Sequence, residues 1–167
     1  KEIVMLTHTA PMKKFCDFQI VQHPANYARC GSSALIHALD FDNLKCDEFQ
    51  GRRIDEFYGI YNPETAYYEC PHCRGIWNNE EKNANVKRAI NYNHLGWSIT
   101  NPSVDDIYGF AFNELLSSFE ASSLVNLAKQ KLKAIKAYDN GHEGLMKSFT
   151  NNSKGEAYVP LNAGLNV

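Results

Sequence analysis

The residues of this sequence that most clearly could do chemistry are two closely spaced cysteines. Cys70 and Cys73 stand in the order Cys-Pro-His-Cys, and this spacing presents two thiolates on a tight turn, as half of a tetrahedral zinc site requires. A complete structural site has four ligands. The residues that could complete this one are Cys16, Cys30, Cys46 and His94. A redox-active dithiol and a turn without metal are the alternatives.

A second candidate site is the loop Ala-Arg-Cys-Gly-Ser-Ser over residues 28–33, which precedes an apolar helical pattern. Backbone N–H groups of such a loop, at a helix N-terminus, suit phosphate. Only Gly31 and Ser33 fit the standard phosphate loop, and Ser32 occupies the position of its lysine. A simple capped helix start is the alternative.

Asp47 and Glu48 form a third candidate, because they follow a weak strand predicted over 41–46. In nucleotide hydrolases, a strand that ends in such a pair supplies one carboxylate toward magnesium and one base that polarises water. Adjacent acidic residues are also common on protein surfaces, so the alternative is an exposed pair without a role.

Cys30 offers a different chemistry. With Gln22 upstream and a helix expected to begin at the cysteine, it resembles the nucleophile of papain-like cysteine peptidases. Such a nucleophile needs a histidine base that a third group orients. His94 and His142 are the candidates for that base.

The secondary structure is clearest in the second half. Helices are predicted over 79–92 and 122–138, with a shorter one over 143–151. Ser122 or Ser123 would cap the second helix, and Gly141 would end it. Its apolar face is predicted from spacings of three and four residues. The residues of that face are Leu124, Ala128, Leu132, Ile135 and Tyr138.

The same helix carries a basic side. Lys129, Lys133 and Lys136 recur at helical spacing, with Lys131 beside them. They would either contact a phosphate backbone or form an ordinary solvated face.

The first half is less regular. A helix is predicted over 33–41, a short helix or turn over 51–58, a strand over 97–101, and a strand or helix over 110–116. With 167 residues, 17 basic and 19 acidic side chains, the chain has the composition of a globular protein. Its net charge of −2 argues against binding nucleic acid by bulk charge. No run approaches the ~18 apolar residues of a membrane helix, so no membrane partner is expected.

The order of several short motifs resembles the large terminase subunit of tailed bacteriophages, the lambda-type DNA-packaging motor. The resemblance covers about residues 52–160. The motifs that carry it are residues 66–73, Lys82-Asn83, Gly96-Trp97, Asn101-Pro102, Gly109-Phe110, residues 113–115, residues 117–119 and residues 149–158.

This resemblance implies an α/β fold, a P-loop-like remnant with a helical C-terminal half and a small cysteine knuckle. Residues 1–60 would be a partial ATPase-like region, and 61–167 the knuckle and the helical segment that links the ATPase to a nuclease. ATP and Mg²⁺ would bind the first region, and Zn²⁺ the knuckle through Cys70 and Cys73. The implied partners are double-stranded DNA, the small terminase subunit and the portal of the procapsid, in the host cytoplasm.

The resemblance also implies roles in the first region. Arg29, Gly31, Ser32 and Ser33 would bind the nucleotide phosphates, Asp47 would face magnesium, and Glu48 would activate water. Asn26 occupies the position of the family's catalytic loop lysine. The family's second cysteine pair and its nuclease part are missing from these residues.

Overall fold

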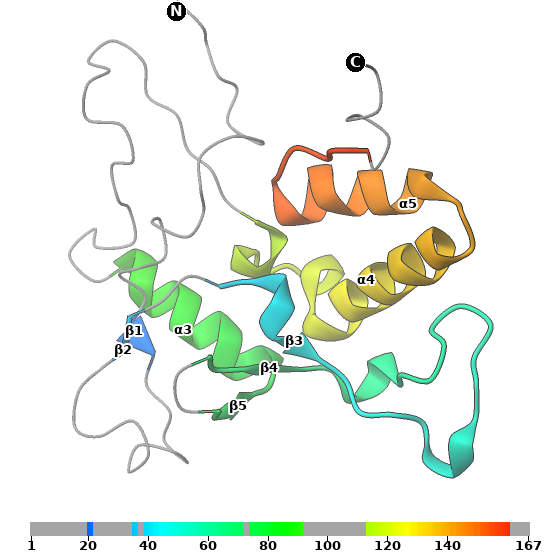
Figure 1. The fold of residues 1–167 in the computed structure, drawn as a ribbon. Helices are drawn as coiled ribbons and strands as arrows, with labels where there is room; N and C mark the ends of the chain where they lie inside the picture. The colour runs from blue at the N-terminus through cyan, green and yellow to red at the C-terminus, as the bar shows by residue number, and fades with distance from the viewer. Residues whose placement is uncertain (1–19, 22–34, 37–38, 72–73, 92–112, 161–167) are drawn as a thin grey trace, which may run out of the picture.

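The computed structural model describes residues 20–21, 35–36, 39–71, 74–91 and 113–160 (Figure 1). The strands are β1 (Ile20–Val21), β2 (Leu35–Ile36), β3 (Leu44–Lys45), β4 (Tyr67–Glu69) and β5 (Ile76–Trp77). The α-helices are α3 (Asn79–Asn91), α4 (Leu124–Asp139) and α5 (Glu143–Ser148), and a π-helix continues α5 over Phe149–Lys154. Short 3₁₀ turns lie at Phe41–Asn43, Gln50–Arg52, Pro63–Thr65, Glu114–Leu116 and Glu120–Ser122.

Two small antiparallel sheets are described: β1 pairs with β2, and β3, β4 and β5 form a three-stranded sheet in that order. Leu44 lies opposite Tyr68, and Tyr68 lies opposite Trp77. The rings of Tyr68 and Trp77 stack with their centroids 5.0 Å apart. The Tyr68 hydroxyl also accepts a hydrogen bond from the backbone N–H of Asp40 (3.2 Å). This central strand therefore ties the sheet to the segment before β3.

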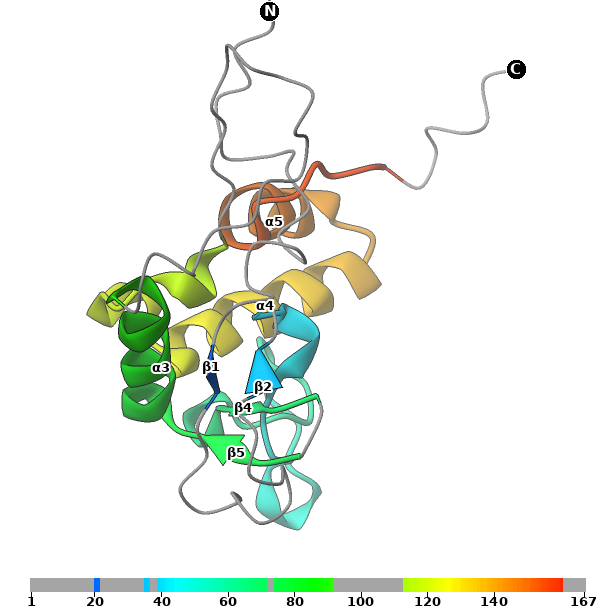
Figure 2. The ribbon, with the colours of Figure 1, turned by 90° about the vertical axis from the view of Figure 1, so that its left-hand side faces the viewer.

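Two helices pack on this sheet, and the third packs on one of them (Figure 2). α4 packs on β3 and β4, α5 packs on α4, and α3 contacts β5. α3 begins with reciprocal hydrogen bonds between Asn78 and Glu81, the capping box that satisfies two free N–H groups. α4 begins at Ser123, whose Oγ accepts from the N–H of Asn126. Gly141 follows the end of α4 with a φ of 83°, a left-handed conformation that suits glycine.

These helices confirm the predictions for 79–92, 122–138 and 143–151, including the cap at Ser123 and the end at Gly141. The predicted apolar face of α4 is only partly right. Leu124 and Ala128 are buried, but Ile135 is 38% exposed, and Leu127 and Ala134 are buried in its place. The buried stripe is rotated, because Lys131 lies on that side of the helix and reaches backbone oxygens beneath it.

The helix predicted over 33–41 is wrong where the structure describes it, since Leu35–Ile36 forms a strand that pairs with β1. The strand predicted over 41–46 is reduced to Leu44–Lys45 after a 3₁₀ turn. Over 51–58, where a short helix or turn is predicted, the structure has turns, with Gly51 at a φ of 75°. The 110–116 segment ends in the 3₁₀ turn Glu114–Leu116. The strand predicted over 97–101 lies outside the described residues.

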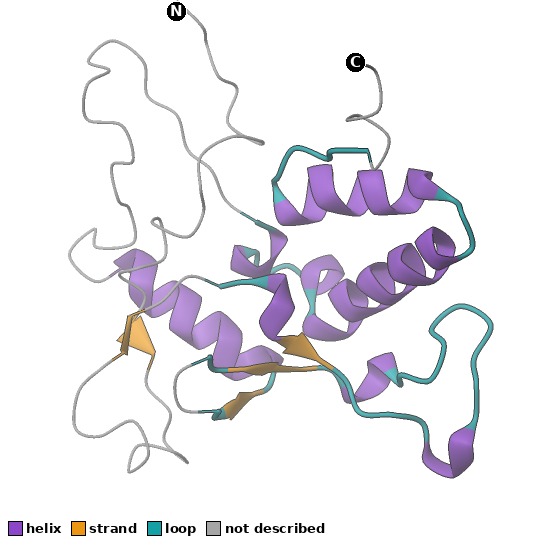
Figure 3. Cartoon of the chain, viewed as in Figure 1, coloured by secondary structure: helices purple, strands orange, loops and turns teal. Residues whose placement is uncertain are grey.

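Figure 3 shows where the helices, strands and loops of the described part lie. All strand pairs there are antiparallel. The stretch 22–34, which contains the expected phosphate loop, lies outside the described residues. The α/β, P-loop-like class thus stays a prediction.

Candidate functional site

The cysteine turn lies in the hairpin between β4 and β5. Cys70 directly follows β4 and is fully buried. Its backbone N–H donates to the carbonyl oxygen of Gly75 (2.8 Å), and its own carbonyl accepts from the N–H of Arg74 (3.0 Å). Arg74 has a φ of 61°, in the left-handed region that few non-glycine residues adopt. The chain thus turns tightly around Cys70, as a knuckle would require.

Zinc fits this turn only in part. The turn offers the Cys70 sulfur, and the sequence adds Cys73, which lies outside the described residues. Among the residues that the structure describes, no three histidine, cysteine or acidic side chains gather as a metal site would need. The remaining ligands would have to come from elsewhere in the chain or from another molecule.

The sheet register removes Cys46 from the candidate ligands. Because Leu44 lies opposite Tyr68 and Lys45 opposite Tyr67, the next position, Cys46, falls beside Ala66. That position is four residues from Cys70 along the strand, or roughly 13 Å at the rise of a β-strand. Two thiolates on one zinc ion lie within roughly 4.6 Å of each other.

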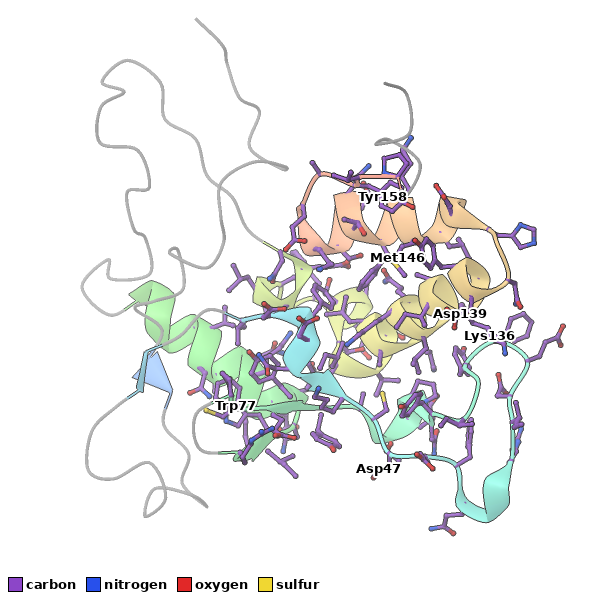
Figure 4. All side chains as sticks on the ribbon, viewed as in Figure 1. Asp47, Trp77, Lys136, Asp139, Met146 and Tyr158 are labelled. Carbon is purple, nitrogen blue, oxygen red and sulfur yellow. The ribbon has the colours of Figure 1, made fainter. Side chains whose placement is uncertain are left out.

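Asp47 and Glu48 lie where the chain leaves β3, and both side chains are exposed. The N–H of Asp47 donates to Thr65 Oγ1 (2.9 Å), and its carbonyl accepts from the N–H of Asn62 (2.8 Å). Glu48 forms a β-bridge with Tyr61. Figure 4 shows Asp47 beyond the sheet, away from Trp77. Backbone contacts therefore fix both residues and leave the carboxylates open to solvent.

The other predicted nucleotide ligands, Arg29, Gly31, Ser32 and Ser33, lie outside the described residues. The distance between that loop and Asp47 is thus untested. Cys30, Gln22 and His94 of the peptidase interpretation also lie outside the described residues. His142 is described, is exposed, and precedes α5.

The basic side of α4 contacts the segment between β3 and β4. Lys129 pairs with Glu64 at 2.6 Å. The ammonium of Lys133 lies over the rings of Phe57 and Tyr58, 5.6 and 5.7 Å from their centroids. Two of the three lysines expected on this side are therefore engaged within the chain, and a contact with a phosphate backbone stays a hypothesis.

Two further lysines, Lys131 and Lys82, act inside the fold in a role that was not predicted from the sequence. Lys131 Nζ donates to the carbonyl oxygens of Phe41 (2.6 Å) and Leu44 (3.1 Å), so it joins α4 to the start of β3. Burial lowers its pKa. The sequence does contain an indication of this role: Lys131 stands three residues after Ala128, at helical spacing on the buried side of α4.

Lys82 on α3 is fully buried. Its Nζ donates to the carbonyl oxygens of Ser117 (2.8 Å) and Ser122 (3.4 Å), in the segment before α4. Burial lowers its pKa to about 8, and the negative charge of Glu114 partly opposes that shift. Lys82 therefore holds α3 against a segment that follows it by more than thirty residues.

The end of the described chain is shaped by the motif over 149–158. Phe149 packs edge-on against Phe41, with centroids 5.0 Å apart. Gly155 has a φ of 69° and ends the π-helix. Asn151 Oδ1 then accepts a hydrogen bond from the N–H of Tyr158 (2.9 Å). These residues stop the helix and turn the chain back over it.

No family model, no curated protein and no solved structure matches the chain. In the part of the chain that the structure describes, no helix has the length and apolar character needed to cross a membrane.

Proposed function

We propose that the chain is part of the large subunit of a viral terminase, the motor that drives double-stranded DNA into a procapsid at the expense of ATP. In this proposal, residues 1–60 hold part of an ATPase-like region. Residues 61–167 hold the cysteine knuckle and the segment that joins the motor to a nuclease. The small terminase subunit and the portal are its protein partners, and the host cytoplasm is where it acts.

One observation supports this proposal above the others: residues of the motifs form hydrogen bonds with residues that are far away in the sequence. Lys82 of one motif donates to the carbonyl oxygen of Ser117 in another, 35 residues later. Asn113 of a third motif donates through Nδ2 to the carbonyl oxygen of Leu39 (2.8 Å) and accepts from the N–H of Leu115. These hydrogen bonds tie residues of the motifs into one core, as the proposal expects of motifs that belong to one domain.

The proposal predicts weak or no ATP turnover by this chain alone. Phosphoryl transfer depends on positioning the phosphates and on neutralising their negative charge. The family's loop lysine does this, but Asn26, which has no charge, occupies its position here. Release of inorganic phosphate, measured with and without Mg²⁺, checks this. Robust magnesium-dependent turnover that Glu48→Gln abolishes would contradict the prediction and would mean that Glu48 works without the lysine.

On this proposal a phage genome encodes the chain, and the role in packaging is tested in that phage. A stop codon early in its reading frame should leave procapsids that assemble but contain little DNA, because no motor fills them. DNase-protected DNA should be nearly absent and should return when the intact chain is supplied from a plasmid. Normal amounts of protected DNA in the stopped mutant would exclude a role in packaging.

A second candidate function is a zinc-knuckle module that binds DNA or a partner protein without catalysis. The tight turn around Cys70, with its two backbone hydrogen bonds, supports this alternative. We expect stoichiometric zinc, measured by mass spectrometry of the intact chain, and its loss in both Cys70→Ser and Cys73→Ser. Cys46→Ser is the matched control and should retain the metal, because Cys46 is too distant to bind it. If the purified protein contains no zinc, the zinc-knuckle function is excluded and the Cys70 segment is a turn without metal.

A further inference from the structure

A hairpin-like arm, residues 47–65, projects from the sheet between β3 and β4 (Figure 1). Its two sides are joined by backbone hydrogen bonds. The N–H of Phe49 donates to the carbonyl oxygen of Ile60 (2.8 Å), and the N–H of Asn62 donates to that of Asp47 (2.8 Å). The arm therefore has a defined shape and is not a simple surface loop.

The tip of the arm is also fixed. Asp55 and Gly59 exchange two backbone hydrogen bonds (2.7 and 3.0 Å). Asp55 Oδ1 accepts from the N–H groups of Phe57 (2.8 Å) and Tyr58 (3.1 Å). Lys133 on α4 lies over both rings. A preorganised tip of this kind loses little conformational entropy when it binds.

Large apolar side chains are concentrated on this arm. Among the described residues, nine large hydrophobic side chains are exposed, and four of them lie within residues 54–61. These four are Ile54 (70% exposed), Phe57 (56%), Ile60 (43%) and Tyr61 (42%). Scattered apolar residues on a surface are ordinary, but a cluster of this kind on one projection marks an interaction site.

The charge of the arm indicates what kind of molecule would cover it. The arm contains five acidic residues and two arginines, a formal charge of −3 (2 − 5). Glu64 is paired with Lys129, and Asp55 lies 4.0 Å from Arg53. Glu48 and Glu56 are exposed beside the apolar cluster. Lys129 and Lys133 of α4 contact the arm, so the charge of this surface with both lysines is −1 (4 − 5). The exposed carboxylates of Glu48 and Glu56 favour a partner with basic groups.

We propose that the arm docks into a protein partner that offers an apolar pocket bordered by lysine or arginine side chains. Ile54 and Phe57 would enter the pocket, and the acidic residues of the arm would face its basic rim. This role goes beyond the proposed packaging function and does not depend on ATP, on zinc, or on any contact with DNA.

The test uses the full chain and synthetic probes of known chemistry. The first probe is a fluorescent amphipathic helical peptide of leucine and lysine, and the second is the same peptide with each lysine replaced by glutamate. Fluorescence anisotropy should show binding of the lysine peptide and none of the glutamate peptide. The double variant Ile54→Ser, Phe57→Ser should weaken that binding by about tenfold or more, as loss of central apolar contacts does.

Phe119→Ser is the matched control, because Phe119 is an exposed phenylalanine outside the arm, and it should leave binding unchanged. Circular dichroism confirms that each variant is folded. The proposal would be overturned if the arm variant bound the lysine peptide as well as the wild type does, or if both peptides bound equally. Binding of a DNA duplex or of phosphatidylserine vesicles that depends on the arm would also overturn it. Arm-dependent self-association in the ultracentrifuge would equally overturn it, since the occupant would then be a second copy.

Discussion

Replacing Lys82 with methionine should lower the free energy of unfolding by about 2–4 kcal/mol, because the carbonyl oxygens of Ser117 and Ser122 would lose a buried charged donor. Urea denaturation followed by circular dichroism measures this change. Lys87→Met is the matched control, since Lys87 is an exposed lysine on the same helix. A loss in Lys82→Met no larger than in Lys87→Met would contradict the structural role of Lys82.

The stability difference between the wild type and Lys82→Met should also depend on pH. Burial lowers the pKa of Lys82 to about 8 from its ordinary value of 10.5. Between those two values the unfolded chain holds more protons on this residue than the folded chain, so Lys82 makes the folded state more stable as pH rises. The stability difference between the wild type and Lys82→Met should therefore widen from pH 8 to pH 10.5. A constant or narrowing difference would show that the ammonium is not desolvated.

Trp77→Ala should have the largest effect on stability, a loss of about 3–5 kcal/mol, because it removes a large buried ring and leaves a cavity. The ring stacks on Tyr68, which lies on the central strand of the three-stranded sheet. The loss should appear as a lower urea midpoint, measured by circular dichroism.

Ile76→Ala is the control for this prediction. Ile76 precedes Trp77 in the same short strand, but its side chain is exposed, so we expect a loss below about 1 kcal/mol. Equal losses in both variants would mean that the strand, and not the buried ring, determines the stability.

The helices could be predicted from the sequence because local signals agree with the final packing. In α4, the cap at Ser123, the periodic apolar residues and the terminal Gly141 all indicate one helix. The rotation of its buried face could not be predicted from apolar periodicity, because a half-buried lysine, Lys131, lies on that face. A lysine with a long apolar stem can satisfy backbone oxygens inside a fold, which a hydrophobic pattern does not record.

The strands were predicted less well, for a physical reason. β4 and β5 contain only three and two residues, too few for an alternating pattern to be recognised. Their pairing depends on the turn around Cys70 and on the stacking of Tyr68 with Trp77, both of which are tertiary features. Similarly, Leu35–Ile36 lies within a stretch whose apolar spacing predicts a helix, but these residues form the strand β2 and pair with β1.

For the candidate site, the sequence identified the cysteine turn, and the structure shows its tight geometry around Cys70. It also offered Cys46 as a metal ligand, which the strand register excludes. The roles of Lys82 and Lys131 were missed, because each depends on backbone oxygens that are distant in the sequence. The nucleotide site formed by Gly31 and Glu48 stays a prediction.

The described residues of 39–71, 74–91 and 113–160 carry most of the motifs on which the proposed function rests, and we expect them to form one cooperative unit. Two probes test it in a Trp97→Phe background, where Trp77 is the remaining tryptophan. Its fluorescence reports the sheet, and far-UV circular dichroism reports the helices. We predict that both signals change at the same urea concentration, as in a two-state transition. Separate midpoints would show that sheet and helices fold independently and would contradict the claim.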